Sequence, residues 1–303
     1  MIYLSTINLK IVTIMKTKHL FIVLFATIGL LPISCNNESK EPADLTINTE
    51  KTELNISYGA DSQQVFDLYL PANRSARTTK TVVIIHGGGW TSGDKNDVNG
   101  LVGLVQRALP SHAVVNMNYR LANGTDRKAF PNQIDDIQNV LNKLVADKAT
   151  YGINGTFALY GISAGAHIAA LYAYTQNEGD RIKAVINMVG PVDFTDPYFA
   201  NNASYQEVLA NLIDTSEYPA GFNAAVTLSP ATQVTTTSPP TINFYGNADP
   251  LVPLTQLTRF EAVLSEKNVI YQSTIYDGGH GNWNATQYAD LQAKIKAFVE
   301  AHY

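Results

Sequence analysis

Three residues whose side chains can together perform nucleophilic catalysis follow three separate apolar runs of the sequence. Ser163, Asp249 and His280 each stand a few positions after such a run. A serine hydroxyl is a poor nucleophile until a base removes its proton, and histidine suits that task because it titrates near neutral pH. An aspartate beside the histidine holds the imidazole in the required tautomer. The three residues therefore predict a serine nucleophile, a histidine base and an aspartate partner.

Glycines flank the predicted nucleophile. Gly161 and Gly165 enclose Ser163 in the pattern G-x-S-x-G. Glycine at these positions lets neighbouring backbone pass closely, as a sharp turn from a strand into a helix requires. We therefore interpret the segment as a strand, a tight turn that exposes the serine, and a helix.

A second glycine-rich loop, His-Gly-Gly-Gly-Trp, begins at His86. The tetrahedral intermediate of acyl transfer carries an oxyanion, which needs fixed N–H donors. The backbone amides of Gly88 and Gly89 can supply such donors. Ala164 can supply another, because its amide begins a predicted helix. These three residues are the predicted oxyanion hole.

Each of these features also has a simpler explanation. G-x-S-x-G occurs by chance, a lone histidine is more often structural than catalytic, and Asp249 before Pro250 can cap a turn. A glycine triplet can be no more than a tight loop. Because all of them fall at the ends of predicted strands that share one sheet edge, the catalytic interpretation is favoured.

Four other residues compete for these roles. His167 lies four residues after the serine, and we expect it to be a packed structural residue on the following helix. His86 is expected to position the glycine loop. Asp193 is an alternative acid, since it follows the next strand. Asp277 stands too close to the catalytic histidine in sequence to orient it.

Apolar, β-branched runs alternate with stretches of helical periodicity over most of the chain. This order predicts an α/β fold with a mostly parallel, doubly wound sheet and an antiparallel N-terminal edge. The predicted strands cover residues 63–70, 81–85, 113–117, 156–160, 184–189, 241–245 and 269–276, and the predicted helices residues 131–146, 164–174, 254–264 and 288–301.

Residues 191–230 interrupt that alternation. The segment is rich in aromatic residues, namely Tyr198, Phe199, Tyr205, Tyr218 and Phe222. We interpret it as a small cap insert that shapes the pocket for the acyl or the alcohol part of a substrate. The alternative is that the aromatic rings only bury the insert against the domain.

The composition excludes several classes of protein. The 303 residues are 45% hydrophobic and 16% charged, with a formal net charge of −5, which is ordinary for a globular protein and unlike a nucleic-acid-binding surface. No cysteine–histidine spacing typical of zinc sites is present, and the glycine-rich loops lack the P-loop and dinucleotide-binding patterns. We therefore expect no cofactor, no metal and no nucleic-acid partner; the oligomeric state stays open.

The N-terminus has the pattern of a signal peptide over residues 1–34. Lys16 and Lys18 precede the apolar run 20–33, which is short for a membrane span. Met15 directly precedes these lysines and is an alternative start of translation.

Cys35, the only cysteine, resembles the lipidated cysteine of a bacterial lipoprotein. Residues 35–44 would be a polar tether and residues 45–303 the folded domain. These features predict an exported protein held at the membrane by a lipid anchor, either periplasmic or on the cell surface. The alternative is a spare thiol near an ordinary cleavage site.

The motifs HGGGW, SGDK, VVNMNYRLA, GISAGA, GNADPLVP and DGGHG follow one another from about Gln63 to the C-terminus. Together they resemble the carboxylesterases of the α/β-hydrolase fold, in the hormone-sensitive-lipase-like and feruloyl-esterase-like (BD-FAE) branches, whose catalytic residues occur in the order serine, aspartate, histidine. The resemblance implies the same nucleophile, base, acid and oxyanion-hole residues. Ile162 stands where many hormone-sensitive-lipase relatives carry an acidic residue, which favours the feruloyl-esterase-like branch.

The sequence therefore predicts a serine carboxylesterase that cleaves short acyl esters through an acyl-enzyme. The resemblance and the predicted export suggest acetyl or feruloyl groups on a polysaccharide as substrates. Two alternatives stay open: an arylformamidase- or peptidase-like amide hydrolase, and a catalytically silent binding lipoprotein of the same fold.

Overall fold

A computed structural model describes residues 45–303. The predicted signal peptide, Cys35 and the tether lie outside the described residues. Within residues 45–303, no helix is both long enough and apolar enough to cross a membrane.

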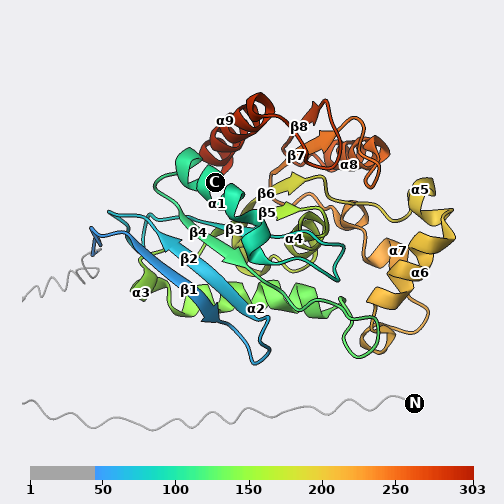
Figure 1. Ribbon diagram of the computed structural model, residues 1–303, viewed down its shortest axis with the longest axis horizontal. Coiled ribbons are helices and arrows are strands. Elements are labelled where there is room, and N and C mark those ends of the chain that lie inside the picture. Colours follow the sequence, from blue (N-terminus) through green and yellow to red (C-terminus); the bar gives the residue numbers. More distant parts are fainter. Residues whose placement is uncertain (1–44) are drawn as a thin grey trace, which may run out of the picture. The chain divides into compact units, whose positions relative to one another are not determined.

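The described chain is built on one eight-stranded sheet in the order β1-β2-β4-β3-β5-β6-β7-β8 (Figure 1). β1 and β2 run antiparallel at one edge, and the pairs from β4 to β8 are parallel. This arrangement confirms the predicted α/β fold with an antiparallel N-terminal edge. The strands are β1 (Lys51–Ser57), β2 (Val65–Leu70), β3 (Thr81–Ile85), β4 (Ala113–Met117), β5 (Phe157–Ile162), β6 (Ile182–Met188), β7 (Thr241–Gly246) and β8 (Tyr271–Tyr276).

Helices cover both faces of the sheet because side chains on successive strand residues point to opposite faces. On β3, Val82 and Ile84 pack with α1 and α9, whereas Val83 and Ile85 pack with α2, α4 and α8. Figure 1 shows α1 and α9 together on one side of the sheet and α2 on the other. The helices are α1 (Asn99–Ala108), α2 (Asn132–Ala146), α3 (Lys148–Tyr151), α4 (Ala164–Thr175), α8 (Leu254–Glu266) and α9 (Ala285–His302).

The predicted cap segment connects β6 to β7 and folds into short helices. Its helices α5, α6 and α7 begin at asparagine or aspartate caps, whose side chains accept backbone N–H groups. Backbone hydrogen bonds of Phe130 with Leu212 and Asp214 fasten the end of α6 to the main domain. The elements are α5 (Pro197–Ala200), α6 (Ala203–Leu212), α7 (Ala224–Thr227) and the 3₁₀ turns Thr215–Glu217 and Pro230–Gln233.

Candidate active site

Ser163 occupies the sharp turn between β5 and α4. Its backbone has φ 54° and ψ −121°, a conformation that costs a non-glycine residue about 1–3 kcal/mol. A Cβ on Gly161 would lie 2.3 Å from the Cα of Ala166, and a Cβ on Gly165 would lie 2.2 Å from the carbonyl oxygen of Ile85. The flanking residues must therefore be glycine for β5, α4 and β3 to approach this closely.

The structure brings the three predicted catalytic residues together. His280 Nε2 lies 2.9 Å from Ser163 Oγ, and His280 Nδ1 lies 2.6 Å from Asp249 Oδ2. The imidazole can therefore donate its Nδ1–H to the carboxylate while Nε2 accepts the serine hydroxyl. The side chain of Asp249 is fully shielded from solvent, and that of His280 is 22% exposed.

The loops that carry the aspartate and the histidine are tied to one another. The Ala248 amide donates to the carbonyl of Gly278 at 2.9 Å, and the Asn247 side chain bonds both the Gly278 amide and the Asp277 carboxylate. These bonds follow β7 and β8, which lie side by side and end at the same edge. Asp277 thus joins the two loops and does not contact the imidazole.

Asp249 is held as a carboxylate. Burial opposes its ionisation, but the hydrogen bond from His280 and the amides of Val252 and Leu251 outweigh that effect, so its pKa lies below the ordinary value. The two amides donate to Oδ1 at 3.0 and 2.8 Å. Oδ2 is thereby left to accept the imidazole N–H.

The glycine loop lies against the serine turn. A Cβ on Gly87 would lie 3.1 Å from the Cβ of Ser163, so the backbone of this loop faces the nucleophile. Gly88 has φ 115°, and a Cβ there would lie 2.0 Å from the carbonyl oxygen of Ser92. Within residues 45–303, the amides of Gly88 and Gly89 have no backbone or side-chain acceptor. The amide of Ala164 begins α4, where no intrahelical acceptor exists.

His86 is buried behind the glycine loop. Its ring stacks on Tyr119 with centroids 4.3 Å apart, and its Nδ1 lies 2.7 Å from the carbonyl oxygen of Gly87. The Tyr119 hydroxyl donates to the carbonyl of His86 at 2.9 Å. Burial lowers the pKa of His86, so the ring stays neutral. These contacts place His86 where it can support the loop.

The competing residues lie outside the Ser163–His280–Asp249 arrangement. His167 is fully buried, with Nε2 2.7 Å from the carbonyl oxygen of Leu228. Asp193 accepts the Arg259 guanidinium at 2.6 Å. Neither residue is hydrogen-bonded to the serine hydroxyl or to the imidazole of His280.

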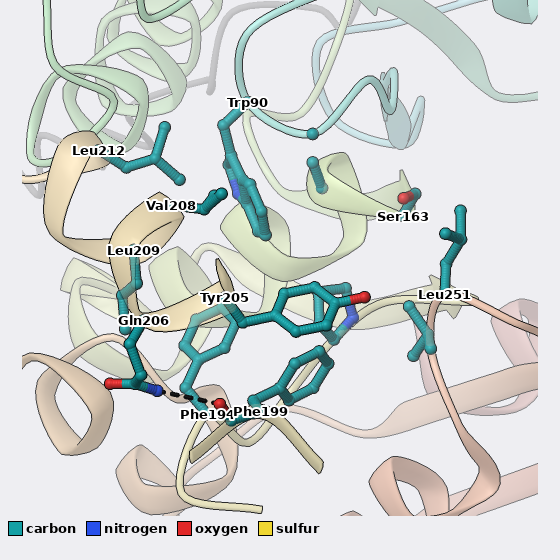
Figure 2. A pocket seen from close by; sticks show the side chains of 14 residues that line it. Trp90, Ser163, Phe194, Phe199, Tyr205, Gln206, Val208, Leu209, Leu212 and Leu251 are labelled. Carbon is teal, nitrogen blue, oxygen red and sulfur yellow. Dashed lines mark hydrogen bonds between the residues drawn. The ribbon is translucent and has the colours of Figure 1, made fainter. Parts of the chain in front are cut away.

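An apolar cavity of about 180 Å³ adjoins Ser163 (Figure 2). It is smaller than the roughly 300–1,000 Å³ typical of pockets for drug-sized ligands. The cap segment supplies much of its wall, which is mostly aromatic or aliphatic. The lining residues from the cap are Pro191, Phe194, Phe199, Tyr205, Gln206, Val208, Leu209 and Leu212.

A second hollow of about 440 Å³ adjoins His280. It runs along α1 and the start of α9 and includes His280, whereas Ser163 lines only the first cavity. Its wall carries the charged residues Asp97 and Arg107. The apolar cavity thus adjoins Ser163, and a less apolar groove adjoins His280.

The sequence analysis missed three residues of the apolar cavity that lie outside the cap segment. They are Trp90, the last residue of HGGGW, and Leu251 and Val252, which stand two and three positions after the aspartate. Their positions directly beside predicted site residues were the available signal. Among the described residues, no cluster of histidine, cysteine, aspartate and glutamate could hold a metal ion.

The sheet order, the serine turn and the strand-end loops define an α/β-hydrolase. Comparison of the sequence with family models then places it more narrowly: the BD-FAE model matches residues 66–264, and the chain belongs to the BD-FAE family. The match covers about two thirds of the chain and contains Ser163 and Asp249, while His280 follows it.

Individual relatives of known name are less than 30% identical to this chain. The chain is 24% identical to Esterase LipC of Mycobacterium tuberculosis over 220 residues, which cover 68% of this chain and 53% of that protein. It is 28% identical to the probable carboxylic ester hydrolase LipM of the same organism over 64% of this chain and 47% of that protein. Arylacetamide deacetylase of Bos taurus is 27% identical over 48% of this chain and 39% of that protein. The chain thus spans about half the length, or less, of these relatives.

Solved structures confirm the fold. A truncated form of a carbohydrate esterase from gut microbiota matches with a TM-score of 0.66 and 22% identity, covering 86% of this chain and 99% of that one. An inhibited esterase B from Lactobacillus rhamnosis matches with a TM-score of 0.66 and 24% identity, covering 86% and 89%. Both similarities extend over nearly all of the described residues.

Proposed function

We propose that this protein is a serine carboxylesterase that forms an acyl-enzyme on Ser163. The observation that carries the proposal is the continuous relay of Ser163 Oγ, His280 and Asp249, with contacts of 2.9 and 2.6 Å. The family and the esterase relatives support the same reaction class.

In the first half of the reaction, Ser163 Oγ attacks the ester carbonyl carbon and His280 Nε2 accepts the hydroxyl proton. Asp249 stabilises the resulting imidazolium through its bond to Nδ1. The carbonyl oxygen becomes an oxyanion that the amides of Gly88, Gly89 and Ala164 can bind. Collapse breaks the bond to the alcohol oxygen, which takes the proton from Nε2.

In the second half, the same imidazole accepts a proton from water, and the hydroxide oxygen attacks the acyl carbon of the Ser163 ester. A second tetrahedral intermediate forms, and the serine oxygen leaves with the proton from His280. The products are the free acid and the unchanged enzyme. Each amide of the oxyanion hole is expected to contribute a factor of about 10²–10³ in rate.

The dimensions of the site favour a short acyl group. The cavity beside Ser163 is about 180 Å³ and almost wholly apolar, which suits an acetyl group or a chain of a few carbons. The larger groove beside His280 combines apolar side chains with Asp97 and Arg107, a mixture that suits a sugar unit, which has apolar C–H faces and polar hydroxyl groups. The carbohydrate esterase among the structural neighbours supports an ester carried on a polysaccharide.

The cellular place of the reaction is part of the same proposal. The lysines, the apolar run and Cys35 at the N-terminus support export and lipid anchoring. An anchored enzyme at the cell surface or in the periplasm would meet polysaccharide fragments there. Palmitate labelling of the wild type and of Cys35→Ala tests this part: label that persists in the variant contradicts it.

Amide hydrolysis is the second candidate, because arylacetamide deacetylase is among the relatives and the same relay can cleave amides. A catalytically silent binding protein is disfavoured by the intact relay. One panel tests all three functions: p-nitrophenyl acetate, acetylated xylan, methyl ferulate and p-nitroacetanilide, each with wild type and Ser163→Ala.

Serine-dependent release of acetate or ferulate supports the esterase. Turnover of the anilide alone would replace it with an amidase, and no turnover on any substrate would favour a binding role.

A further inference from the structure

Both the backbone and the indole ring of Trp90 are held by hydrogen bonds, although the residue lies in a loop. Its backbone has φ 65°, which is unusual for a large residue. Its indole lines the cavity beside Ser163, together with side chains of α6. In the view of Figure 2 the indole is drawn between Ser163 and the α6 residues Val208 and Leu212. Trp90 and these α6 residues therefore line the same cavity that a group extending from Ser163 would enter.

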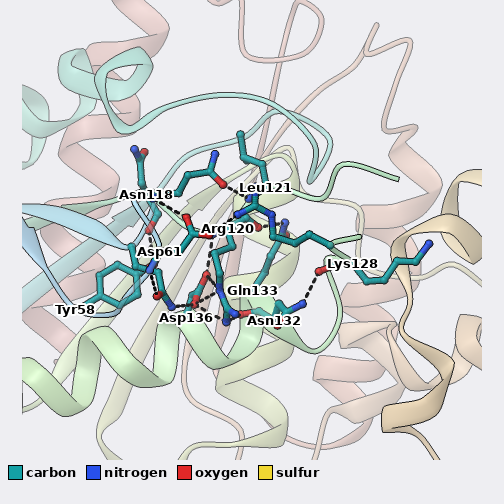
Figure 3. A network of polar contacts seen from close by, with 12 residues as sticks. Tyr58, Asp61, Asn118, Arg120, Leu121, Lys128, Asn132, Gln133 and Asp136 are labelled. Carbon is teal, nitrogen blue, oxygen red and sulfur yellow. Dashed lines mark hydrogen bonds and ion pairs between the residues drawn. The ribbon is translucent and has the colours of Figure 1, made fainter. Parts of the chain in front are cut away.

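The backbone of Trp90 is fixed from α2. Its carbonyl accepts the Gln133 side-chain amide at 2.8 Å and the Ala122 backbone amide at 3.0 Å. Gln133 is fully buried and also donates to the carbonyl of Arg120 at 2.9 Å. Figure 3 shows Gln133 beside Arg120, whose guanidinium pairs with the buried carboxylate of Asp136. The loop thus rests on a buried polar network.

The indole of Trp90 is fixed from α4. Its Nε1–H donates to Nδ1 of His167 at 3.2 Å. Since Nδ1 accepts, the proton of the neutral ring is on Nε2, which donates to the carbonyl of Leu228 at 2.7 Å. Burial lowers the pKa of His167 to about 4, which keeps this single neutral tautomer. One imidazole therefore connects the cavity wall to the cap segment.

The cavity that Trp90 lines is the one suited to the acyl group. It includes Ser163 and the oxyanion-hole residues Gly89 and Ala164, whereas His280 lines the second groove. His280 must protonate the leaving oxygen, and we therefore assign the alcohol to the groove that His280 lines. The acyl chain, the remaining substituent of the tetrahedral carbon, is then assigned to the apolar cavity that Ser163 lines.

We propose that Trp90 sets the length of acyl chain that the site accepts, and that His167 and Gln133 are positioning residues that hold Trp90 in place. The proposal rests on the proposed esterase function and adds a specificity-determining residue to it. A smaller ring at position 90 leaves space at the α6 end of the cavity, which longer acyl chains can fill.

The first test measures kcat/KM for p-nitrophenyl acetate, butyrate, hexanoate and octanoate with wild type and Trp90→Phe. We expect the hexanoate-to-acetate ratio to rise by about tenfold, the lower end of what a changed apolar pocket gives. A parallel series of acetate esters with alcohols of increasing length serves as control. An unchanged acyl ratio, or a shift in the alcohol series instead, would overturn the proposal.

The second test separates the two hydrogen bonds of His167. In His167→Asn, Oδ1 can replace Nδ1 as acceptor for Trp90, whereas in His167→Gln, Nε2 can replace the donor to Leu228 but leaves the indole unpaired. We expect a larger shift of the acyl ratio in His167→Gln than in His167→Asn. Equal shifts, or a larger one in His167→Asn, would contradict a role through Trp90.

A double variant distinguishes the proposed coupling of His167 to Trp90 from a general loss of structure. Once Trp90→Phe has removed the indole N–H, adding His167→Gln should change the acyl ratio no further. Independent, multiplicative effects would contradict the proposed coupling between Trp90 and His167.

Gln133 is tested separately. Gln133→Met should shift the hexanoate-to-acetate ratio as Trp90→Phe does, and no shift would remove Gln133 from the proposal. Failure of the esterase function itself is distinguishable, because wild type would then show no serine-dependent turnover.

Discussion

Nε2 of His280 lies 2.9 Å from the hydroxyl oxygen of Ser163, although 117 positions of sequence separate the two residues. The distance arises because β5 and β8 belong to one sheet whose parallel strands end at the same edge. Ser163 follows β5 directly, and His280 lies in the loop after β8. The sheet therefore brings the loops that carry Ser163 and His280 to one edge, and the loops place the two side chains within hydrogen-bond distance.

Asp249 is expected to be the acid of the relay. In Asp249→Asn the carboxamide oxygen should keep the amides of Leu251 and Val252, which leaves the Nδ2 donor facing His280 Nδ1. The imidazole then takes the wrong tautomer, and kcat should fall by about 10⁴. The matched control is Asp193→Asn, which breaks the ion pair with Arg259 but leaves the imidazole untouched. Steady-state kinetics on p-nitrophenyl acetate measure both. A larger loss of kcat in Asp193→Asn would move the acid to the strand after the nucleophile.

Gly165 is expected to tolerate no side chain. A Cβ there would lie 2.2 Å from a backbone oxygen, which cannot move aside, so Gly165→Ala should lower the free energy of unfolding by about 1–3 kcal/mol or more. Gly100→Ala is the control, because nothing lies within 4 Å of a Cβ at that position in α1. Alanine there should stabilise the protein by about 0.5–1 kcal/mol. Urea unfolding measures both, and equal effects would contradict the packing described.

Acid should destabilise the protein through His167. Its pKa is lowered from 6.5 to about 4 by burial, so the unfolded chain binds a proton more readily than the folded one. Stability from this residue is complete above pH 6.5 and falls as the pH drops towards 4, by up to roughly 3 kcal/mol. Unfolding free energies of wild type and His167→Gln at pH 7 and pH 4.5 test this. The variant should lose less stability on acidification, and an equal loss would contradict the prediction.

Elements with a plain periodic pattern could be predicted from the sequence. The predicted strand 113–117 coincides with β4, and the predicted helix 131–146 differs from α2 by one residue. The strand is mostly apolar and β-branched, and the apolar residues of the helix are regularly spaced. Several elements were not predicted, and α1 and β1 show two different reasons. α1 contains Gly100 and Gly103, which weaken a helix, and forms because its apolar face packs beside α9.

β1 was missed for a different reason. Its residues are mostly exposed, and a bulge between Glu53 and Ile56 disrupts the alternation that marks a strand.

At the candidate active site, the residues that carry the chemistry could be predicted because their types and their positions at strand ends are informative. The support of Trp90 by Gln133 and His167 could not, since those bonds join α2, α4 and the glycine loop only in the folded chain.

The most direct test of the account is the behaviour of Ser163→Ala. Intact-mass measurement after treatment with a fluorophosphonate should show one adduct on the wild type and none on the variant. Hydrolysis of p-nitrophenyl acetate should fall by about 10³–10⁶. Ser111→Ala, which removes an exposed hydroxyl, serves as the control and should keep both properties. Full activity or undiminished labelling in Ser163→Ala would contradict the assignment of the nucleophile.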